Sequence, residues 1–147
     1  MSETKYKVSL FVSPSGFPFW FAVHPWFILE HNGSVSRWEV THVNRAGANN
    51  WGHLSLNILP PSLGIGIFHY NKNPRWPSRS IGSIEGDEGS LAQRITEFIE
   101  ASKDTYPYRS RYAFSSPNSN TYVQWLLNHF SEWKVTLPWN AFGKNYK

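Results

Sequence analysis

The hydrophobic period of this sequence changes at Ser90, and that change limits the fold class. Before it, apolar residues recur mainly at every second position or in short runs, as in buried strands. After it, Leu91, Ile95 and Ile99 recur at the spacing of one helical face. Strands followed by helices are typical of an α+β domain with an antiparallel sheet. We therefore predict an antiparallel sheet of about four to six strands packed against two main helices.

Several segments before Ser90 are expected to be strands. Asn32-Gly33 lies between two of them and tolerates the positive φ angles of a two-residue type I′ turn, which predicts a hairpin. Pro60 and Pro61 separate two others, which we expect to pair with each other. Residues 70–80 carry two prolines and three basic residues and are expected to form a long loop or a lid. The predicted strands are 6–12, 19–29, 38–43, 53–59 and 63–68.

Two helices are expected after Ser90, over residues 90–103 and 119–131. Ser90 and Gln93 have the spacing of a capping box at the start of the first. The second follows SSPNS, so Ser119 falls in its first turn. The tail from 137 to 147 is expected to be coil packed on the domain by Trp139 and Phe142. The length predicts one domain over residues 1–147.

Composition excludes several kinds of chemistry. The sequence has no cysteine, which rules out disulfides, a thiolate nucleophile and cysteine-based metal sites. Its six histidines show no pair at the i, i+4 spacing that, with a carboxylate, marks a zinc-binding helix. We therefore expect neither a metal nor a cofactor.

The charge pattern and hydropathy restrict the partners. The net charge is +4, but basic residues are dispersed among acidic ones. Nucleic acid is therefore a disfavoured partner, although tyrosines and arginines alternate between Tyr106 and Tyr112 in a pattern that suits base stacking. No apolar run approaches the ~20 residues of a membrane span, and no signal peptide is recognisable. We predict a cytoplasmic protein whose oligomeric state the sequence leaves open.

His24 and Glu39 are candidates for a catalytic pair. If Asn32 and Gly33 are the turn residues, the numbers of any two residues that face each other across the hairpin add up to 65. Glu39 then faces Trp26 and lies diagonal to His24. Such diagonal neighbours are ~7–8 Å apart at Cα, within reach of a hydrogen bond between a long carboxylate and an imidazole. A carboxylate that orients a histidine is the base half of a catalytic triad.

Ser119 is the candidate nucleophile. Free backbone N–H groups and the helix dipole in the first turn of a helix stabilise developing negative charge. Each candidate also has an ordinary structural interpretation. His24 can be a packed core residue, Glu39 can face solvent, and Asn118 or Ser119 can be a helix cap. Pro25 within the strand implies an edge or a bulge, and a bulge would turn Glu39 away from His24.

Several motifs resemble an uncharacterised bacterial family with a domain of unknown function. That family shows His-Thr-Trp, Tyr-Pro-Tyr, Pro-Asn-Ser-Asn-Thr-Phe and Ala-Ile-Gly-Lys motifs, and the resemblance covers about residues 19–147. PNSNTY and AFGKNY together are its most specific part. The corresponding stretches here are AVHPWF, WEV, GDEGSLAQRITEFIEASKDTYPYRSRY, SPNSNTYVQWLL and LPWNAFGKNY.

The order of a histidine first and a helix-opening nucleophile later is similar to the circularly permuted papain-like superfamily. That superfamily includes lecithin retinol acyltransferase and bacterial cell-wall amidases, and its helix usually opens with Asn-Cys. The resemblance carries the histidine onto His24, the third polar residue onto Glu39 and the cysteine onto Ser119. This sequence departs from the pattern at the nucleophile itself, and also in having His-Pro where the uncharacterised family has His-Thr.

Two main functions follow as hypotheses. The first is a hydrolase or acyl-transferring enzyme acting on an amide or ester. It would use His24, Glu39 and Ser119 with backbone N–H groups near Asn120, and Trp26, Trp38, Asn118 and Asn120 would bind substrate. The second is a non-catalytic module that binds a peptide, sugar or lipid in an aromatic cleft. The tryptophans expected in that cleft are Trp20, Trp26, Trp38, Trp51 and Trp76.

Overall fold

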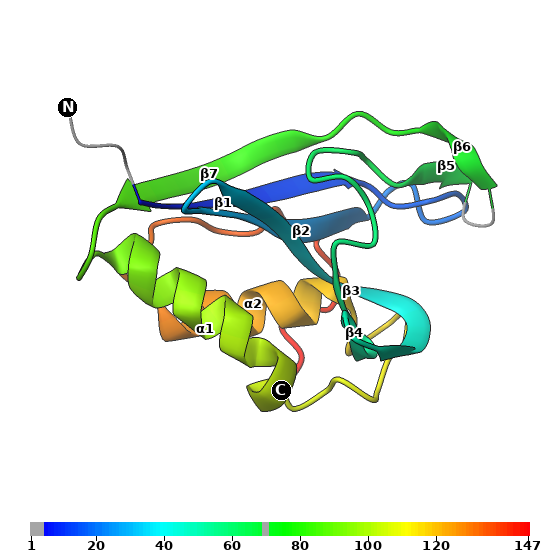
Figure 1. The fold of residues 1–147 in the computed structure, drawn as a ribbon. Helices are drawn as coiled ribbons and strands as arrows, with labels where there is room; N and C mark the ends of the chain where they lie inside the picture. The colour runs from blue at the N-terminus through cyan, green and yellow to red at the C-terminus, as the bar shows by residue number, and fades with distance from the viewer. Residues whose placement is uncertain (1–4, 69–70) are drawn as a thin grey trace.

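The structure is a computed structural model that describes residues 5–68 and 71–147. Its main sheet has five antiparallel strands in the order β4-β3-β2-β1-β7, and β5 and β6 form a separate two-stranded sheet (Figure 1). With two helices, this confirms the predicted α+β class. The strands are β1 (Tyr6–Pro14), β2 (Val23–His31), β3 (Ser34–Gly47), β4 (Asn50–Leu56), β5 (Gly66–Phe68), β6 (Asn71–Arg75) and β7 (Arg79–Gly86). The helices are α1 (Leu91–Thr105) and α2 (Ser119–His129).

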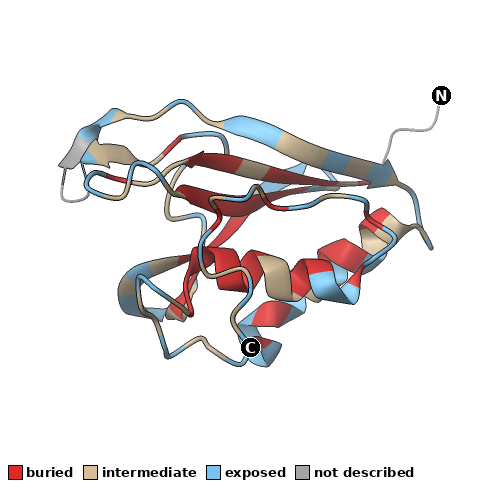
Figure 2. Cartoon of the chain, turned by 180° about the vertical axis from the view of Figure 1, so that it is seen from behind, coloured by how far each residue is buried: buried red, intermediate tan, exposed pale blue. Residues whose placement is uncertain are grey.

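Both helices cover the same face of the main sheet, and the hydrophobic core lies between them and the strands (Figure 1). Buried positions concentrate in the central strands and on the helices, whereas β7 is exposed or half-buried throughout (Figure 2). No helix in the described ranges is long and apolar enough to cross a membrane. The core is built from Val8, Leu10, Val12, Phe27, Leu29, Trp38, Val40 and Leu54 of the sheet and Ile95, Ile99, Tyr122, Val123 and Leu126 of the helices.

The prediction that Trp139 and Phe142 pack the tail onto the domain was wrong. They are 79% and 44% exposed, and the smaller apolar residues Leu137 and Ala141 enter the core instead.

Both helices begin where the sequence predicted. The Ser90 hydroxyl accepts the backbone N–H of Gln93 at 3.1 Å, as an N-cap should. The Gln93 side chain accepts the N–H of Gly89 at 2.6 Å instead of that of Ser90, so the expected capping box is displaced by one residue. The N-cap of α2 is Asn118. Ser119 is therefore the first helical residue and not the cap.

The β2–β3 hairpin has the predicted register. Asn32 and Gly33 have φ angles of 51° and 79°, and Phe27 pairs with Trp38. The ladder between β2 and β3 ends at that pair, two residues after Pro25, which has no N–H to donate. On its other side Pro25 pairs with Val12 of β1 without a register shift. The hairpin is therefore regular near its turn and unpaired where His24 lies.

Two predictions about the middle of the chain were wrong. Residues 53–59 and 63–68 do not pair with each other, because β4 pairs with β3 and β5 pairs with β6. The segment between them instead covers the sheet, where its carbonyl groups accept side-chain hydrogen bonds.

The segment 70–80 contains β6 and the start of β7 instead of one long loop or lid, and its residue 70 lies outside the described residues. The hydrophobic pattern does not predict β7, because β7 is an edge strand with few large side chains. It includes Gly82, where an added Cβ would lie 2.4 Å from the Val135 side chain.

Candidate functional site

A buried group of three polar side chains forms the centre of the candidate site. His24 Nε2 lies 2.6 Å from Glu39 Oε2. The Arg37 guanidinium holds the same carboxylate with two hydrogen bonds, from Nε to Oε1 at 2.6 Å and from Nη2 to Oε2 at 3.1 Å. Arg37 and Glu39 are almost wholly buried, and the His24 side chain is 10% exposed. The expectation that Glu39 reaches His24 is confirmed.

The alternation of strand side chains explains why these groups meet. Trp38 and Val40 point into the helix-covered core, so Arg37 and Glu39 point to the opposite face of β3. His24 and Trp26 occupy that same face of β2, because Val23 and Phe27 belong to the core. The diagonal relation across the hairpin then places His24 beside Glu39.

The segment around Pro60 completes the burial of this group. Arg37 Nη1 donates to the carbonyl oxygens of Pro60 at 3.0 Å and Leu63 at 2.6 Å. Trp26 Nε1 donates to the carbonyl of Pro61 at 2.8 Å, and its ring lies 3.9 Å beneath the Arg37 guanidinium. The buried charge is therefore neutralised by Glu39 and solvated by carbonyl groups and an aromatic face.

Electrostatics keeps Glu39 ionised at neutral pH. Burial raises the pKa of Glu39, but the hydrogen bond and charge of His24 and the neighbouring Arg37 outweigh it, so the pKa lies below its ordinary value. An ionised carboxylate only accepts hydrogen bonds, so His24 Nε2 must carry the proton it shares with Glu39. In a neutral imidazole Nδ1 of His24 is then the acceptor nitrogen, and it has no hydrogen-bond partner within residues 5–68 and 71–147.

The start of α2 presents Ser119 without using it structurally. The Asn118 carboxamide oxygen accepts the N–H groups of Asn120 at 3.0 Å and Thr121 at 3.3 Å. The N–H groups near Asn120 that we expected to serve as oxyanion donors are therefore occupied. Within the described part of the chain, neither the hydroxyl nor the N–H of Ser119 makes a hydrogen bond. Ser119 is thus the residue of this turn whose polar groups are unused, although the residue is buried and only 6% exposed.

Three motifs that lie far apart in the sequence meet at this turn. Asn120 Nδ2 donates to the carbonyl of Val23 at 3.1 Å and to that of Phe142 at 3.0 Å. Asn118 Nδ2 also donates to Phe142, at 2.9 Å. The Thr121 hydroxyl donates to Gly143 at 2.8 Å. The polar side chains of PNSNTY therefore join the strand residue before His24 to AFGKNY, which explains physically why these motifs belong together.

The structure does not join Ser119 to His24. Asn120 anchors the start of α2 directly beside Val23, but the His24 ring lies on the sheet face opposite the helices. No hydrogen bond links Ser119 to His24 or Glu39 in the described ranges. His24 and Glu39, predicted as base and orienting residue, are in contact with each other, whereas the link between the start of α2 and β2 runs through the neighbouring residues Asn120 and Val23.

The predicted substrate-binding tryptophans are buried. Trp26 is wholly enclosed on the outer face of the sheet, and Trp38 stacks on Trp51 at 5.7 Å on the core side. Neither ring is open to a ligand in this structure, and substrate binding by Trp26 or Trp38 stays a prediction. The amide groups of Asn118 and Asn120 make hydrogen bonds within the protein. The exception is Asn120 Oδ1, which is buried without a partner in the described chain.

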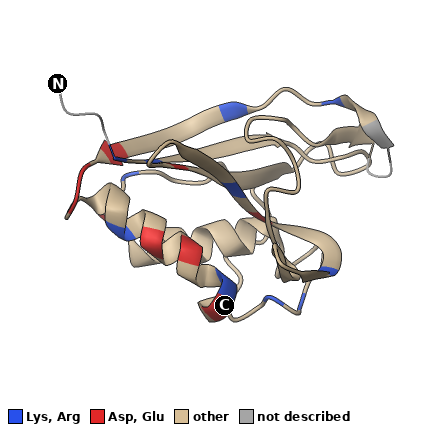
Figure 3. Cartoon of the chain, in the orientation of Figure 1, with Lys and Arg blue, Asp and Glu red and all other residues tan. Residues whose placement is uncertain are grey.

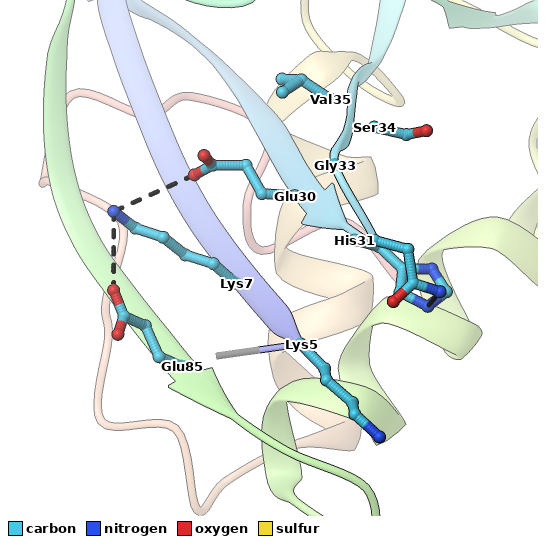
Figure 4. A pocket seen from close by; sticks show the side chains of 9 residues that line it. Lys5, Lys7, Glu30, His31, Gly33, Ser34, Val35 and Glu85 are labelled. Carbon is cyan, nitrogen blue, oxygen red and sulfur yellow. Dashed lines mark hydrogen bonds and ion pairs between the residues drawn. The ribbon is translucent and has the colours of Figure 1, made fainter. Parts of the chain in front are cut away.

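Two surface hollows lie apart from these residues. One, of about 280 Å³, is at the hairpin end of the sheet, where Lys7 lies 3.7 Å from Glu85 and 3.9 Å from Glu30 (Figure 4). Lys7 pairs with Glu30 and Glu85 of the same lining, and Lys5 pairs with Glu88 outside it. The other, of about 310 Å³, is bounded by Trp139, Phe142 and Lys144 of the tail, next to the start of α2. Neither includes His24, Glu39 or Ser119.

Comparison with known proteins identifies the family. Residues 5–146 match the family described as "Protein of unknown function (DUF3750)". The chain belongs to the DUF3750 family. This confirms the expected membership of a family with a domain of unknown function. No significant match was found among the curated proteins or among the solved structures.

Sequence reasoning missed Arg37, the third member of the buried group. An arginine in a hairpin strand is ordinarily solvent-facing, and nothing in its immediate neighbours marks it as buried. The available signal was its spacing. Arg37 is two residues before Glu39, which places both side chains on the same face of one strand.

Proposed function

We propose that this DUF3750 protein is a hydrolase or acyl-transferring enzyme of the circularly permuted papain-like type, acting on an ester or amide. His24 is the general base, Glu39 orients it and Ser119 is the nucleophile. The observation that carries the proposal is the buried 2.6 Å bond between His24 Nε2 and Glu39, which leaves Nδ1 of His24 without a partner in the described chain. Nδ1 is not among the buried polar atoms that lack a partner in the described residues, so it is open to solvent, where a general base can take up a proton.

The reaction would follow from these groups. Ser119 Oγ attacks the substrate carbonyl carbon while Nδ1 of His24 takes its proton. The N–H of Ser119 at the start of α2 donates to the oxyanion that forms. The imidazolium returns the proton to the leaving amine or alcohol, giving an acyl-serine. His24 then deprotonates water or an acceptor alcohol, which attacks the acyl-serine, and the imidazolium returns that proton to Ser119 Oγ as the acyl group leaves.

The proposal requires His24 and the start of α2 to approach each other. The ladder between β2 and β3 ends at Phe27, so the backbone of His24 pairs with Ser13 of β1 on one side and with no residue of β3 on the other. Catalytic hydrogen bonds are also often long before substrate binds. Arg37 is a positioning residue in this scheme, because it helps to keep Glu39 ionised and fixed.

Ser119→Cys tests the proposal, because it introduces the chain's single thiol. A thiol near a histidine base and a helix N-terminus should be unusually acidic. We expect iodoacetamide to modify Ser119→Cys at least about tenfold faster near neutral pH than Ser131→Cys, an exposed control beyond the other end of α2. Adding His24→Ala should reduce the rate to that of the control. Equal rates for both thiols, unaffected by His24→Ala, would exclude the catalytic assignment.

A second candidate function is the non-catalytic binding module. The observation that favours it is a set of aromatic side chains exposed beside the start of α2, which includes Trp20, Phe21 and Trp139. An inert thiol at position 119 together with ligand binding at this surface would support that function over catalysis.

A further inference from the structure

Exposed aromatic rings form a connected surface at the end of the molecule where α2 begins. We call Trp20, Phe21, Phe114, Trp139 and Phe142 the aromatic surface; each is between 44% and 79% exposed. Ring centroids are 6.2 Å apart for Trp20–Phe21, for Phe21–Phe142 and for Trp139–Phe142. Phe19 connects Phe21 at 6.5 Å to Phe114 at 4.9 Å. The rings are therefore one patch and not scattered hydrophobic residues.

The backbone holds this surface in place. Asn140 Nδ2 donates to the Phe21 carbonyl at 3.1 Å, and the Val23 N–H donates to the Asn140 carbonyl at 3.3 Å. Asn118 and Asn120 bind the Phe142 carbonyl from the other side. The loop before β2 and the tail are thus fastened together while their rings point outward. Contiguous exposed apolar patches often mark interaction sites, whereas hydrophobic residues that are exposed singly do not.

Positive charge flanks the patch. Lys144 lines the same hollow as Trp139 and Phe142, and Arg111 lies 6.0 Å from the ring of Tyr146, which also lines it. Within the described residues Lys144 Nζ contacts only the carbonyls of Leu137 and Pro138. The segments 13–24, 106–119 and 137–147 contain no Asp or Glu. Acidic residues instead lie mainly on α1 and at the end of the sheet near the N-terminus (Figure 3).

We propose that the aromatic surface docks onto an anionic phospholipid bilayer. Tryptophan rings are favoured at the boundary between headgroups and acyl chains, and lysine and arginine beside them attract anionic headgroups. Protein interfaces are depleted in lysine, whereas here Lys144 shares a hollow with the most exposed ring. This docking does not depend on the proposed catalysis, although it would bring Ser119 close to lipid.

Co-sedimentation with vesicles tests the proposal. We expect the full chain to bind phosphatidylcholine vesicles containing about 30% phosphatidylserine and to bind pure phosphatidylcholine much more weakly. The double variant Trp20→Ala/Trp139→Ala should lower the association constant at least about tenfold. Lys144→Gln should lower it about fivefold. The matched controls are Val35→Ala, an exposed apolar residue on the hairpin, and Lys134→Gln, an exposed lysine beyond the other end of α2; both should bind like the parent protein.

Three outcomes would overturn the proposal. The parent protein fails to bind the anionic vesicles, the tryptophan variant binds them equally well, or Val35→Ala weakens binding as much as the tryptophan variant does. A dimer in sedimentation velocity that the tryptophan variant abolishes, without vesicle binding, would assign the surface to self-association instead. Lys144→Gln keeps the test decisive if the tryptophan variant misfolds. Ser119→Cys should bind vesicles like the parent protein, so the catalytic proposal can fail while the membrane proposal holds.

Discussion

The two faces of the main sheet are both buried, but by different physical means. On one face Phe27, Trp38 and Leu54 pack against helices through non-directional apolar contacts. On the other, Arg37 and Glu39 are buried beneath the segment around Pro60 through charge-assisted hydrogen bonds with fixed geometry. Apolar packing tolerates changes of similar volume, whereas each member of a buried ionic group depends on the others. The outer face is therefore where a single substitution should have the largest consequence.

The largest expected effect is that of Arg37→Met. Removing the guanidinium leaves Glu39 buried without its bidentate partner and deprives the Leu63 carbonyl of a donor. We expect the free energy of unfolding to fall by about 3–5 kcal/mol in urea titration. Arg45→Met, which changes an exposed arginine on the same strand, should stay within about 0.5 kcal/mol.

The helix-covered face supplies the contrast to this variant. Leu54→Met conserves volume in the core and should cost less than about 1.5 kcal/mol. If Arg37→Met were no more destabilising than Leu54→Met, the two faces would not differ as described.

The sequence predicts the contact between His24 and Glu39 but neither the burial of Arg37 nor the position of Ser119 relative to His24. Asn32-Gly33 fixes the hairpin register through its φ requirements, and the register alone places Glu39 beside His24. Arg37 was missed because burying it depends on the carbonyls of Pro60 and Leu63, which a strand pattern does not reveal. The relation of Ser119 to His24 depends on which layer each occupies, and only the assembled fold determines that.

A second effect tests the junction between α2 and the tail. Gly143 has φ +100°, and an added Cβ would lie 2.4 Å from the Asn118 carboxamide oxygen that caps α2. Gly143→Ala should therefore destabilise the protein by about 2–3 kcal/mol, combining backbone strain with disturbance of the cap. Gly89→Ala is the matched control, because Gly89 has φ +80° but no atom near the added Cβ. It should cost only about 1 kcal/mol, and equal costs would show that the Asn118 contact is unimportant.

A smaller effect comes from acid. The pKa of Glu39 is held below its ordinary value, so its contribution to stability is fully present above the unfolded-state pKa and is lost as pH falls through the folded-state pKa. We expect stability below about pH 4.5 to fall by at most roughly 1.4 kcal/mol per pH unit from this group.

Denaturation of Glu39→Gln over the same pH range isolates that contribution. The variant should be less stable at neutral pH but have a shallower acid slope, since it lacks this proton uptake. An unchanged slope would mean that Glu39 does not titrate differently on folding.

The smallest expected change in stability is that of Ser119→Ala, and a small change would show that the Ser119 hydroxyl is not structural. Asn118 supplies the cap of α2, so Asn118→Ala should cost about 1–2 kcal/mol. Ser119→Ala should change the free energy of unfolding by less than about 0.5 kcal/mol, because its hydroxyl bonds to nothing within residues 5–68 and 71–147. Under the proposed function the same variant should abolish turnover of an activated ester. A Ser119→Ala protein as destabilised as Asn118→Ala would mean that the hydroxyl is structural, and it would remove the nucleophile from the proposed site.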